Sequence, residues 1–534
     1  MSFTTLHFFL FLAMGVLIYY LLPKKLQWVW LLVLSYLYYF TFSIKTSVFL
    51  IFTTVVTYTG GILLTRMNES SKAYLAANKE TLDRAAKKAY KEKVKKNKRR
   101  VVVAMLLLCF GLLGVVKYLN FVIENIDALV LAVGHGQYFE PVNIILPLGI
   151  SFYTFQSISY IIDVYQGKYS AEKNLFKYAL FVSFFPQLLQ GPIGRFDRLA
   201  HQLYEGRSFS LKAAEFGLQR ILWGCFKKMV LADRISPFVT EVFKHSDQYE
   251  GMIFFLAAVM YSIQIYCDFS GCMDIVRGTS ECFGITLGEN FRRPYFSQTL
   301  PEFWRRWHIS LGAFFREYVF YPVSTSKILL KWNTKVRKYL GNAIGTGFAS
   351  CVPILCVWIL TGLWHGAKWN YIGWGFFHGI LICLSTLFEQ PVAKLTEKLN
   401  IRTNCISWNI FRMLRTFLLC VIGRIIFMGK GIRASFQMIT SCIVDYRKIY
   451  DLVNDFSISQ REWGVIFIGV LILLCVSIAQ EIREQIGIKE DIRDWLLRQN
   501  LWLRWTVLIA GILCVLIFGV YGTGSQIVFI YEQF

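Results

Sequence analysis

The sequence has little charge and little proline for its length. Of its 534 residues, 17% are Asp, Glu, Lys or Arg and 11 residues are proline, whereas 55% are hydrophobic. A soluble protein of this size carries about a quarter charged residues, so this composition argues against a soluble fold. Apolar runs of about 17–22 residues, long enough to cross a hydrocarbon layer, recur along the chain. The period-two alternation of a transmembrane β-barrel is absent, which leaves an all-α polytopic membrane protein.

Several signatures of known sites are also missing. The 13 cysteines form no CxxC pair and mostly lie inside apolar runs, so we interpret them as small buried hydrophobes. No HExxH motif or i, i+4 histidine pair indicates a metal site, and no GxSxG elbow indicates a serine nucleophile. The N-terminus lacks a basic region and an A-x-A-like cleavage site, which predicts a retained first span.

The apolar runs predict about 11 transmembrane helices, with shorter re-entrant and interfacial helices between them. Segments 175–189 and 216–231 are ambiguous. The second has a helical apolar stripe decorated by Arg220, Lys227 and Lys228, which fits an interfacial amphipathic helix. The predicted spans are residues 5–22, 26–42, 46–64, 101–119, 144–164, 251–268, 343–361, 371–388, 407–427, 463–479 and 504–521.

The positive charge is concentrated in loops. The formal net charge is +23, which in a membrane protein is typical of orienting basic loops rather than of a nucleic-acid surface. Residues 65–100 hold 13 Lys or Arg and four Asp or Glu, which predicts a cytoplasmic loop and an N-terminus outside. This loop has good helix formers and could continue an adjacent span. It is either a solvated positive-inside loop or a docking site for an acidic donor protein or anionic lipid headgroups.

Three polar stretches interrupt the apolar pattern. Proline and glycine cluster in 184–199, which predicts a broken, re-entrant segment beside a cavity. Asp268 ends a span and precedes 289–322, a stretch too charged to span and too aromatic for an ordinary loop, which suits an interface or an internal funnel. The third stretch is GLWHGAKW at 362–369.

His308 and His365 are candidate general bases. Burial favours a neutral imidazole, which can take a proton from an acceptor hydroxyl as its oxygen attacks an activated acyl group such as a thioester. Either histidine could instead make a hydrogen-bonded contact between helices, although ionisable groups inside a membrane are candidates for function. His378 follows His365 by 13 residues and would face elsewhere on a regular helix, so we interpret it as packing.

The motifs DFSGCMDIVRG, ENFRRPYFSQTLPEFWRRWHISL and GLWHGAKWNYIGWGFFHG together resemble the membrane-bound O-acyltransferase (MBOAT) superfamily. In particular, the chain resembles a bacterial branch that includes alginate O-acetyltransferase and the teichoic-acid D-alanylation protein, and its ending FIYEQF is similar to that of the branch. The resemblance is strongest over 145–390. It implies one membrane domain over 1–534, with helices around a central tunnel that 184–199 and 289–322 help to line.

The resemblance also implies an activity and its residues. We expect transfer of an acyl group, acetyl in the first instance, from a cytoplasmic thioester (acyl-CoA or an acyl carrier) toward a cell-envelope polysaccharide outside a bacterial cell membrane. An extracytoplasmic hydrolase-like partner would accept the acyl group, and no bound cofactor or metal is expected. His365 corresponds to the catalytic residue and His308 to a second functional position. Candidate tunnel residues, which could instead form an ion-pair and aromatic scaffold, are Asp268, Asn290, Trp304, Arg305, Arg306 and Trp307.

Two alternatives stay open at this point. The first keeps the fold but moves D-alanine from a carrier protein to teichoic acid. The second is a polytopic transporter without acyl chemistry, against which the chain shows no duplicated half. A lipid acyltransferase of an internal membrane is a weaker possibility, because the motifs belong to the bacterial branch.

Overall fold

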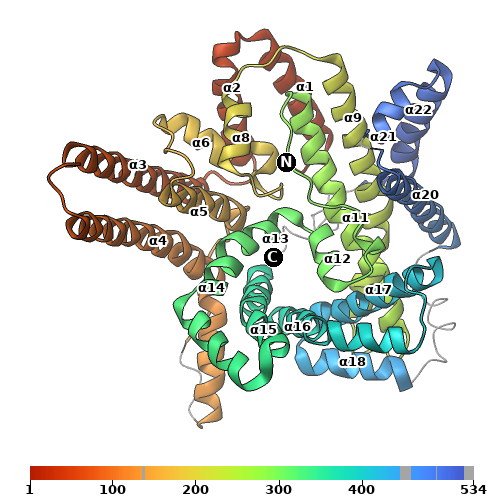
Figure 1. Cartoon of the computed structure of the whole chain (residues 1–534). Coiled ribbons are helices and arrows are strands. Elements are labelled where there is room, and N and C mark those ends of the chain that lie inside the picture. The colour runs from red at the N-terminus through yellow and green to blue at the C-terminus, as the bar shows by residue number, and fades with distance from the viewer. Residues whose placement is uncertain (135–138, 445–458, 489, 522–534) are drawn as a thin grey trace. The chain divides into compact units, whose positions relative to one another are not determined.

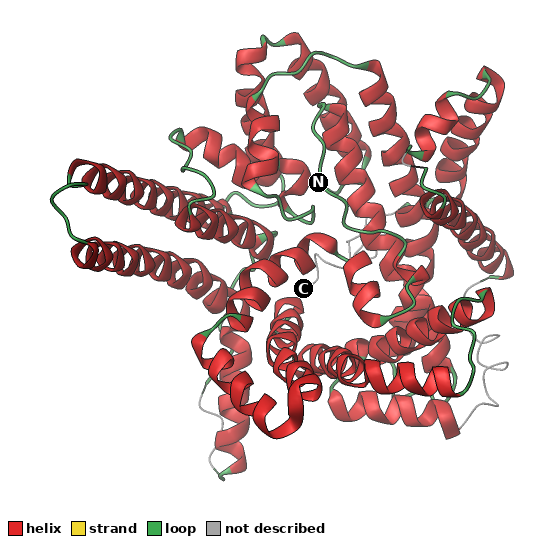
Figure 2. Cartoon of the chain, viewed as in Figure 1, coloured by secondary structure: helices red, strands yellow, loops and turns green. Residues whose placement is uncertain are grey.

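The computed structural model describes residues 1–134, 139–444, 459–488 and 490–521. These residues form helices joined by loops (Figure 2), with one isolated antiparallel bridge between Phe291 and Trp307. The chain divides into two compact units, residues 1–217 with 279–288 and residues 218–278 with 289–534. The single membrane domain stays a prediction. The ending FIYEQF lies outside the described residues.

The first unit takes in the N-terminal helices, and α9 continues from it into the second unit. Glycines 60 and 61 of α3 allow close packing, since a Cβ on Gly61 would lie 2.9 Å from the Tyr160 ring of α5. The helices are α1 (Leu6–Leu21), α2 (Lys24–Phe40), α3 (Ser47–Ala77), α4 (Arg84–Ala132), α5 (Ile150–Gln166), α6 (Leu175–Ser183), α7 (Phe185–Leu188), α8 (Phe196–Tyr204) and α9 (Leu211–Cys225).

The basic segment 65–100 continues the two neighbouring spans as helix, as its composition suggested. Helices α3 and α4 run side by side as a long hairpin (Figure 1). Asp83 caps α4 by accepting the Ala86 N–H at 2.7 Å, and the Tyr74 and Tyr90 rings stack across the hairpin with centroids 4.3 Å apart. A cleft of about 350 Å³ beside it has four lysines in its lining: Lys72, Lys91, Lys95 and Lys98. The docking role of this segment stays a prediction.

The proline- and glycine-rich segment 184–199 is broken, as predicted. Helix α6 ends at Ser183, α7 makes a single turn, and an irregular stretch leads to α8. Gly191 allows the chain to double back, because a Cβ there would lie 2.2 Å from the Cα of Gln187. Its place in a membrane stays a prediction.

The second unit contains the aromatic and arginine-rich stretch 289–322 as a series of short helices. Figure 1 labels most of its α-helices. They are a π-helix (Phe226–Ala232), α10 (Asp233–Lys244), α11 (Ile253–Cys282, shared with the first unit), a 3₁₀ turn (Pro294–Phe296), α12 (Leu300–Arg306), α13 (Ile309–Phe315), a π-helix (Arg316–Phe320), α14 (Tyr321–Ser324), α15 (Lys327–His365), α16 (Trp369–Lys398), α17 (Ile406–Met428), α18 (Ile432–Val444), α20 (Gln460–Gln485), α21 (Ile492–Leu497) and α22 (Leu501–Phe518).

Seven helices among the described residues are long and apolar enough to cross a membrane, so the predicted number of 11 is not confirmed. Helices α1, α2 and α5 have only 16, 17 and 17 residues, and α17 carries three arginines. In α22, 6% of the apolar window is buried within the protein. So large an uncovered apolar surface requires a hydrocarbon environment. The seven are α3, α4, α11, the part of α15 from Gly347 to His365, α16, α20 and α22.

The interfacial helix predicted at 216–231 is wrong in one respect. Lys227 and Lys228 are 3% and 1% exposed and do not form a polar surface. Both lie in a π-helical turn and form ion pairs with α11. The apolar stripe of a single segment cannot show that another helix supplies carboxylates to its polar face.

Candidate active site

His365 is the last residue of α15 and lies in an aromatic pocket. It is 6% exposed. Its imidazole contacts the rings of Trp364, Trp374 and Phe427 at centroid distances of 4.9, 5.0 and 5.3 Å, and the Trp374 and Phe427 contacts are edge-on at 90°. The histidine of the GLWHG motif is therefore enclosed by aromatic rings.

The first and last residues of the GLWHG motif are glycines, and close packing between α15 and α16 requires both. A Cβ on Gly362 would lie 2.4 Å from the backbone oxygen of Tyr371, and a Cβ on Gly366 would lie 2.7 Å from the Tyr371 ring. Helix α15 ends at His365 because Gly366 adopts an extended conformation, and α16 begins at Trp369. The motif thus turns the chain sharply directly after the histidine.

His308 lies between α12 and α13 in a left-handed backbone conformation with φ 47°. Asn290 braces this turn: its side-chain Oδ1 accepts the Ser310 N–H at 2.9 Å and lies 3.4 Å from His308 Nδ1, and its backbone oxygen accepts the Ile309 N–H at 3.0 Å. His308 is outside the seven apolar helices, and burial lowers its pKa to about 3. At neutral pH this imidazole is uncharged.

Trp364 brings the two predicted histidines into one site. Its ring contacts the His308 imidazole at 5.6 Å as well as that of its neighbour His365 at 4.9 Å. His308 also contacts Phe269 of α11 at 4.8 Å. Asn290 lies 18 residues before His308, and His308 lies 57 residues before His365, yet all three converge within the second unit.

The two tryptophans predicted beside His308 pack into the same aromatic cluster. Trp307 contacts Phe291 at 5.0 Å and is 3% exposed. Trp304 contacts Trp358 and Trp374 at 4.7 and 5.5 Å. Since Trp374 also touches His365, Trp304 lies one ring away from the candidate catalytic residue.

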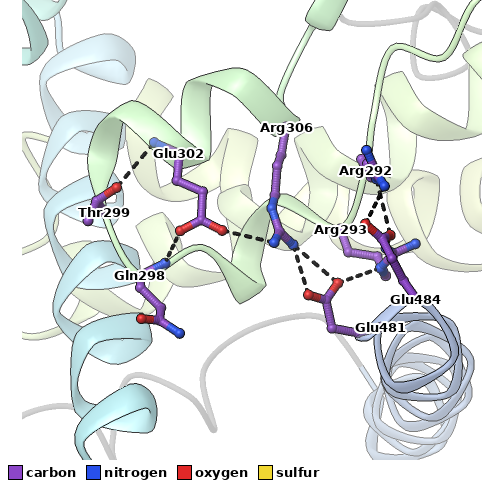
Figure 3. A network of polar contacts seen from close by, with 8 residues as sticks. All are labelled: Arg292, Arg293, Gln298, Thr299, Glu302, Arg306, Glu481 and Glu484. Atoms are coloured by element: carbon purple, nitrogen blue, oxygen red, sulfur yellow. Dashed lines mark hydrogen bonds and ion pairs between the residues drawn. The ribbon is translucent and has the colours of Figure 1, made fainter. Parts of the chain in front are cut away.

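The predicted arginines lie apart from the histidines. Arg306 forms ion pairs with Glu302 at 2.8 Å and with Glu481 of α20 at 3.1 Å, as Figure 3 shows. The same Glu481 accepts Arg293 Nε at 2.7 Å. These arginines fasten the stretch 289–322 to α20. Arg305 is exposed on α12.

Asp268 belongs to a buried ion-pair network on α11. It is 2% exposed and accepts Lys228 Nζ at 2.6 Å. Lys228 also reaches Asp233 at 2.8 Å, while Lys227 bonds to Asp274 at 2.6 Å. The neighbouring residue Phe269 touches His308, so Asp268 is close to the site in sequence but is engaged by Lys228.

His378, which we interpreted as packing, lies in the aromatic cluster. Its ring contacts Trp304 at 4.9 Å and Trp374 at 5.2 Å, and it is 1% exposed. The interpretation assumed one regular helix from His365 to His378, but the chain breaks at residues 366–368. The glycine after His365 was the signal that could have shown this break.

A further buried polar residue, Arg424 of α17, went unnoticed in the sequence. It is 3% exposed, and its guanidinium lies over the Trp307 ring at 4.9 Å. No three His, Cys, Asp or Glu side chains gather as a possible metal site in the part of the chain that the structure describes.

Comparison with known proteins decides the family. A model of the membrane-bound O-acyltransferase family matches residues 170–334, which include Asn290 and His308. The probable alginate O-acetylase AlgI of Pseudomonas aeruginosa is 30% identical over 472 residues, covering 88% of this chain and 80% of that protein. The chain belongs to the membrane-bound O-acyltransferase family. It is an MBOAT protein with several membrane-spanning helices.

Other MBOAT relatives match over shorter regions. The probable alginate O-acetylase AlgI of Azotobacter vinelandii is 36% identical over 326 residues, which cover 61% of this chain and 59% of that protein. The teichoic acid D-alanyltransferase of Bacillus subtilis is 28% identical over 255 residues, covering 47% of this chain and 61% of that protein. Relatives named for two different acyl groups are therefore similar to this chain.

Proposed function

We propose that this MBOAT protein is an O-acyltransferase that moves acetyl from a cytoplasmic thioester toward a polysaccharide of the cell envelope. The observation that carries the proposal is the convergence of His308 and His365 on Trp364 in a buried aromatic site. The alginate O-acetylases are more similar to this chain in identity and match a larger share of it than the D-alanyltransferase does, which favours acetyl over D-alanine.

In this proposal His365 is the general base. Its imidazole would take the proton of an acceptor hydroxyl as that oxygen attacks the thioester carbonyl, and the thiolate would leave. The surrounding rings of Trp364, Trp374 and Phe427 keep water from competing with the acceptor. A relay in which His365 itself carries the acyl group uses the same surroundings.

His308 supports His365 in this proposal. If Nδ1 donates its proton to Asn290 Oδ1, the basic Nε2 is turned toward the remaining site, and the neutral ring can orient a substrate by hydrogen bonding. A neutral imidazole suits this role because it adds no charge to a buried site before the reaction starts. Asn290 then acts by fixing the tautomer and the ring direction.

The donor and partners belong to the same proposal. The donor is acetyl-CoA or an acetylated carrier, and an extracytoplasmic hydrolase-like protein receives the acyl group. The chain would lie in a bacterial cell membrane with its N-terminus outside, as the basic segment 65–100 favours. D-alanyl transfer to teichoic acid is the second candidate, which the Bacillus subtilis relative supports less strongly.

The test is the ester content of surface polymer in cells that express the wild type, His365→Ala or His308→Ala at equal protein level. Mild base releases the ester, and identification of the freed acid separates acetate from D-alanine. We expect loss of ester in both variants. His201→Ala is the matched control, because His201 is an exposed histidine of α8. Unchanged ester in His365→Ala would refute the mechanism and leave the transporter alternative.

A further inference from the structure

Arg424 is a buried cation without an acidic partner among the described residues. It lies on α17 and is 3% exposed. Its Nε and Nη2 atoms are buried and make no hydrogen bond. Guanidinium stays protonated at every relevant pH, so this side chain cannot escape the penalty of burial by losing its charge. A buried charge is tolerated when another group supplies the opposite charge.

The protein neighbours of Arg424 supply only part of that compensation. Trp307 covers one face of the guanidinium at 4.9 Å. A cation–π contact engages the face of the group, whereas the N–H bonds lie in its plane, so the unbonded nitrogens still require an acceptor. Burial raises the pKa of the Tyr295 hydroxyl, and the nearby Arg424 charge acts in the opposite direction. A phenol that stays protonated adds no counter-charge.

Further buried nitrogens without a hydrogen bond lie in the aromatic cluster around His378, next to Arg424. Trp304 Nε1, Trp374 Nε1 and His378 Nδ1 are also buried and make no hydrogen bond. Their rings contact one another, with Trp304 and Trp374 at 4.9 and 5.2 Å from His378. Four N–H donor atoms and one imidazole nitrogen thus lack a hydrogen bond within one buried cluster, whereas the large majority of buried polar atoms in native proteins have a partner.

This cluster adjoins both the candidate base and Arg424. Trp374 lies 5.0 Å from His365 on one side and contacts His378 on the other. His378 in turn lies against α17 directly before Arg424, since a Cβ on Gly423 would be 2.6 Å from His378 Nε2. The donors are therefore placed next to the position at which the acyl group would react.

We propose that Arg424, together with the indole N–H groups of Trp304 and Trp374, forms an internal binding site for a negatively charged oxygen group beside His365. The planar guanidinium matches a carboxylate, or a carbonyl oxygen that gains negative charge during acyl transfer. The assignment of that oxygen to an acyl group or to an acidic sugar of the acceptor rests on the proposed function. The binding of an anionic oxygen group by Arg424 and the two indoles does not rest on the proposed function.

The binding test uses the full chain in detergent and sodium acetate as the probe, because acetate is a carboxylate of the size of the acyl group. Tryptophan fluorescence and calorimetry follow the titration, with sodium chloride at equal ionic strength as reference. The wild type binds acetate, and Arg424→Met weakens binding at least about tenfold. Arg412→Met is the matched control, because Arg412 is a half-buried arginine of the same helix, and it keeps wild-type affinity.

Two results would overturn the proposal: a wild type that binds acetate no better than chloride, and an Arg424→Met variant that binds as the wild type does. Should Arg424→Met fail to fold, Arg424→Lys keeps the charge without the planar fork and is expected to bind acetate several-fold more weakly; equal binding by folded Arg424→Lys contradicts the proposal.

Kinetics identify the source of the oxygen. A fall in kcat of about 100-fold in Arg424→Met with an unchanged thioester KM assigns it to the acyl carbonyl, and a raised acceptor KM assigns it to the acceptor. Arg424-dependent acetate binding in a protein that transfers no acyl group would refute the proposed function alone.

Discussion

Replacing Asn290 by alanine should damage both the stability of the site and the orientation of His308. The change removes Oδ1, which accepts the Ser310 N–H at 2.9 Å and lies 3.4 Å from His308 Nδ1. Asn290 is 1% exposed and this bond is partly buried, so water replaces the lost acceptor poorly. A buried donor left without its acceptor costs about 1–3 kcal/mol.

The loss of activity should exceed what this destabilisation explains. His308 holds an unfavourable left-handed conformation with φ 47°, which the bonds to Asn290 help to maintain. Without Oδ1 the ring can rotate, and misplacement of a group by about 1 Å can lower a rate on the order of 100-fold. The assay compares thermal unfolding in detergent with initial rates of acyl transfer at a temperature at which both proteins are folded.

Asn404→Ala is the control, since Asn404 is exposed in the loop before α17. We expect Asn404→Ala to match the wild type in both measurements. If Asn290→Ala unfolded and turned over as the wild type does, the structural role of this contact would be refuted. If it lost stability but kept its rate, Asn290 would brace the fold without orienting His308.

Three further predictions concern other parts of the second unit. Burial lowers the pKa of His308 to about 3 from about 6.5 in an unfolded chain, so protons bind the unfolded state first as the pH drops. His308 should therefore contribute a fall in stability of about 1.4 kcal/mol per pH unit between pH 6.5 and 3, and His308→Gln should reduce the slope in unfolding measurements by this amount. Glu481→Gln removes one of the two carboxylates that pair with each of Arg293 and Arg306 and should cost about 2 kcal/mol in chemical denaturation, whereas Glu490→Gln, in an exposed pair, should change stability by less than about 0.5 kcal/mol. Gly362→Ala places a Cβ 2.4 Å from an α16 backbone oxygen and should lower both the unfolding temperature and the rate, whereas Gly464→Ala, with open space around it, should not.

Each of these predictions has a result that contradicts it. An identical pH slope in His308→Gln would show that another group titrates. Equal effects of the Glu481 and Glu490 changes would mean that the network of Figure 3 adds nothing beyond a surface pair. A fully active and stable Gly362→Ala would show that α15 and α16 need no close approach.

The class of fold could be predicted because it depends on local patterns, and the same patterns make the two histidines candidates. Apolar runs of spanning length fix a helical membrane protein, and a histidine inside such a run, as at His365, marks an expensive polar group. The pairing of charges could not be predicted in this way. Lys228 and Asp268 are 40 residues apart, and Glu481 and Arg306 are 175 residues apart. Only the packing of α11 and α20 shows which charge meets which.

The errors have the same physical origin. A helical wheel drawn through 216–231 turns Lys227 and Lys228 toward water, but the fold turns them toward α11. The aromatic contacts of His378 agree with its interpretation as packing, but the regular helix assumed between His365 and His378 is broken after His365, and Trp374 contacts both rings. Arg424 was passed over because a single arginine in an apolar helix has no motif around it.

The most direct measurement of the central proposal is acyl transfer by the purified protein reconstituted into lipid vesicles and supplied with labelled acetyl thioester, the extracytoplasmic partner protein and an acceptor glycan. We predict that the wild type moves the label to acceptor hydroxyls and that His365→Ala does so at least about 100-fold more slowly, while still folding and reconstituting like the wild type. Equal transfer by the wild type and His365→Ala would contradict the assignment of His365 as the base.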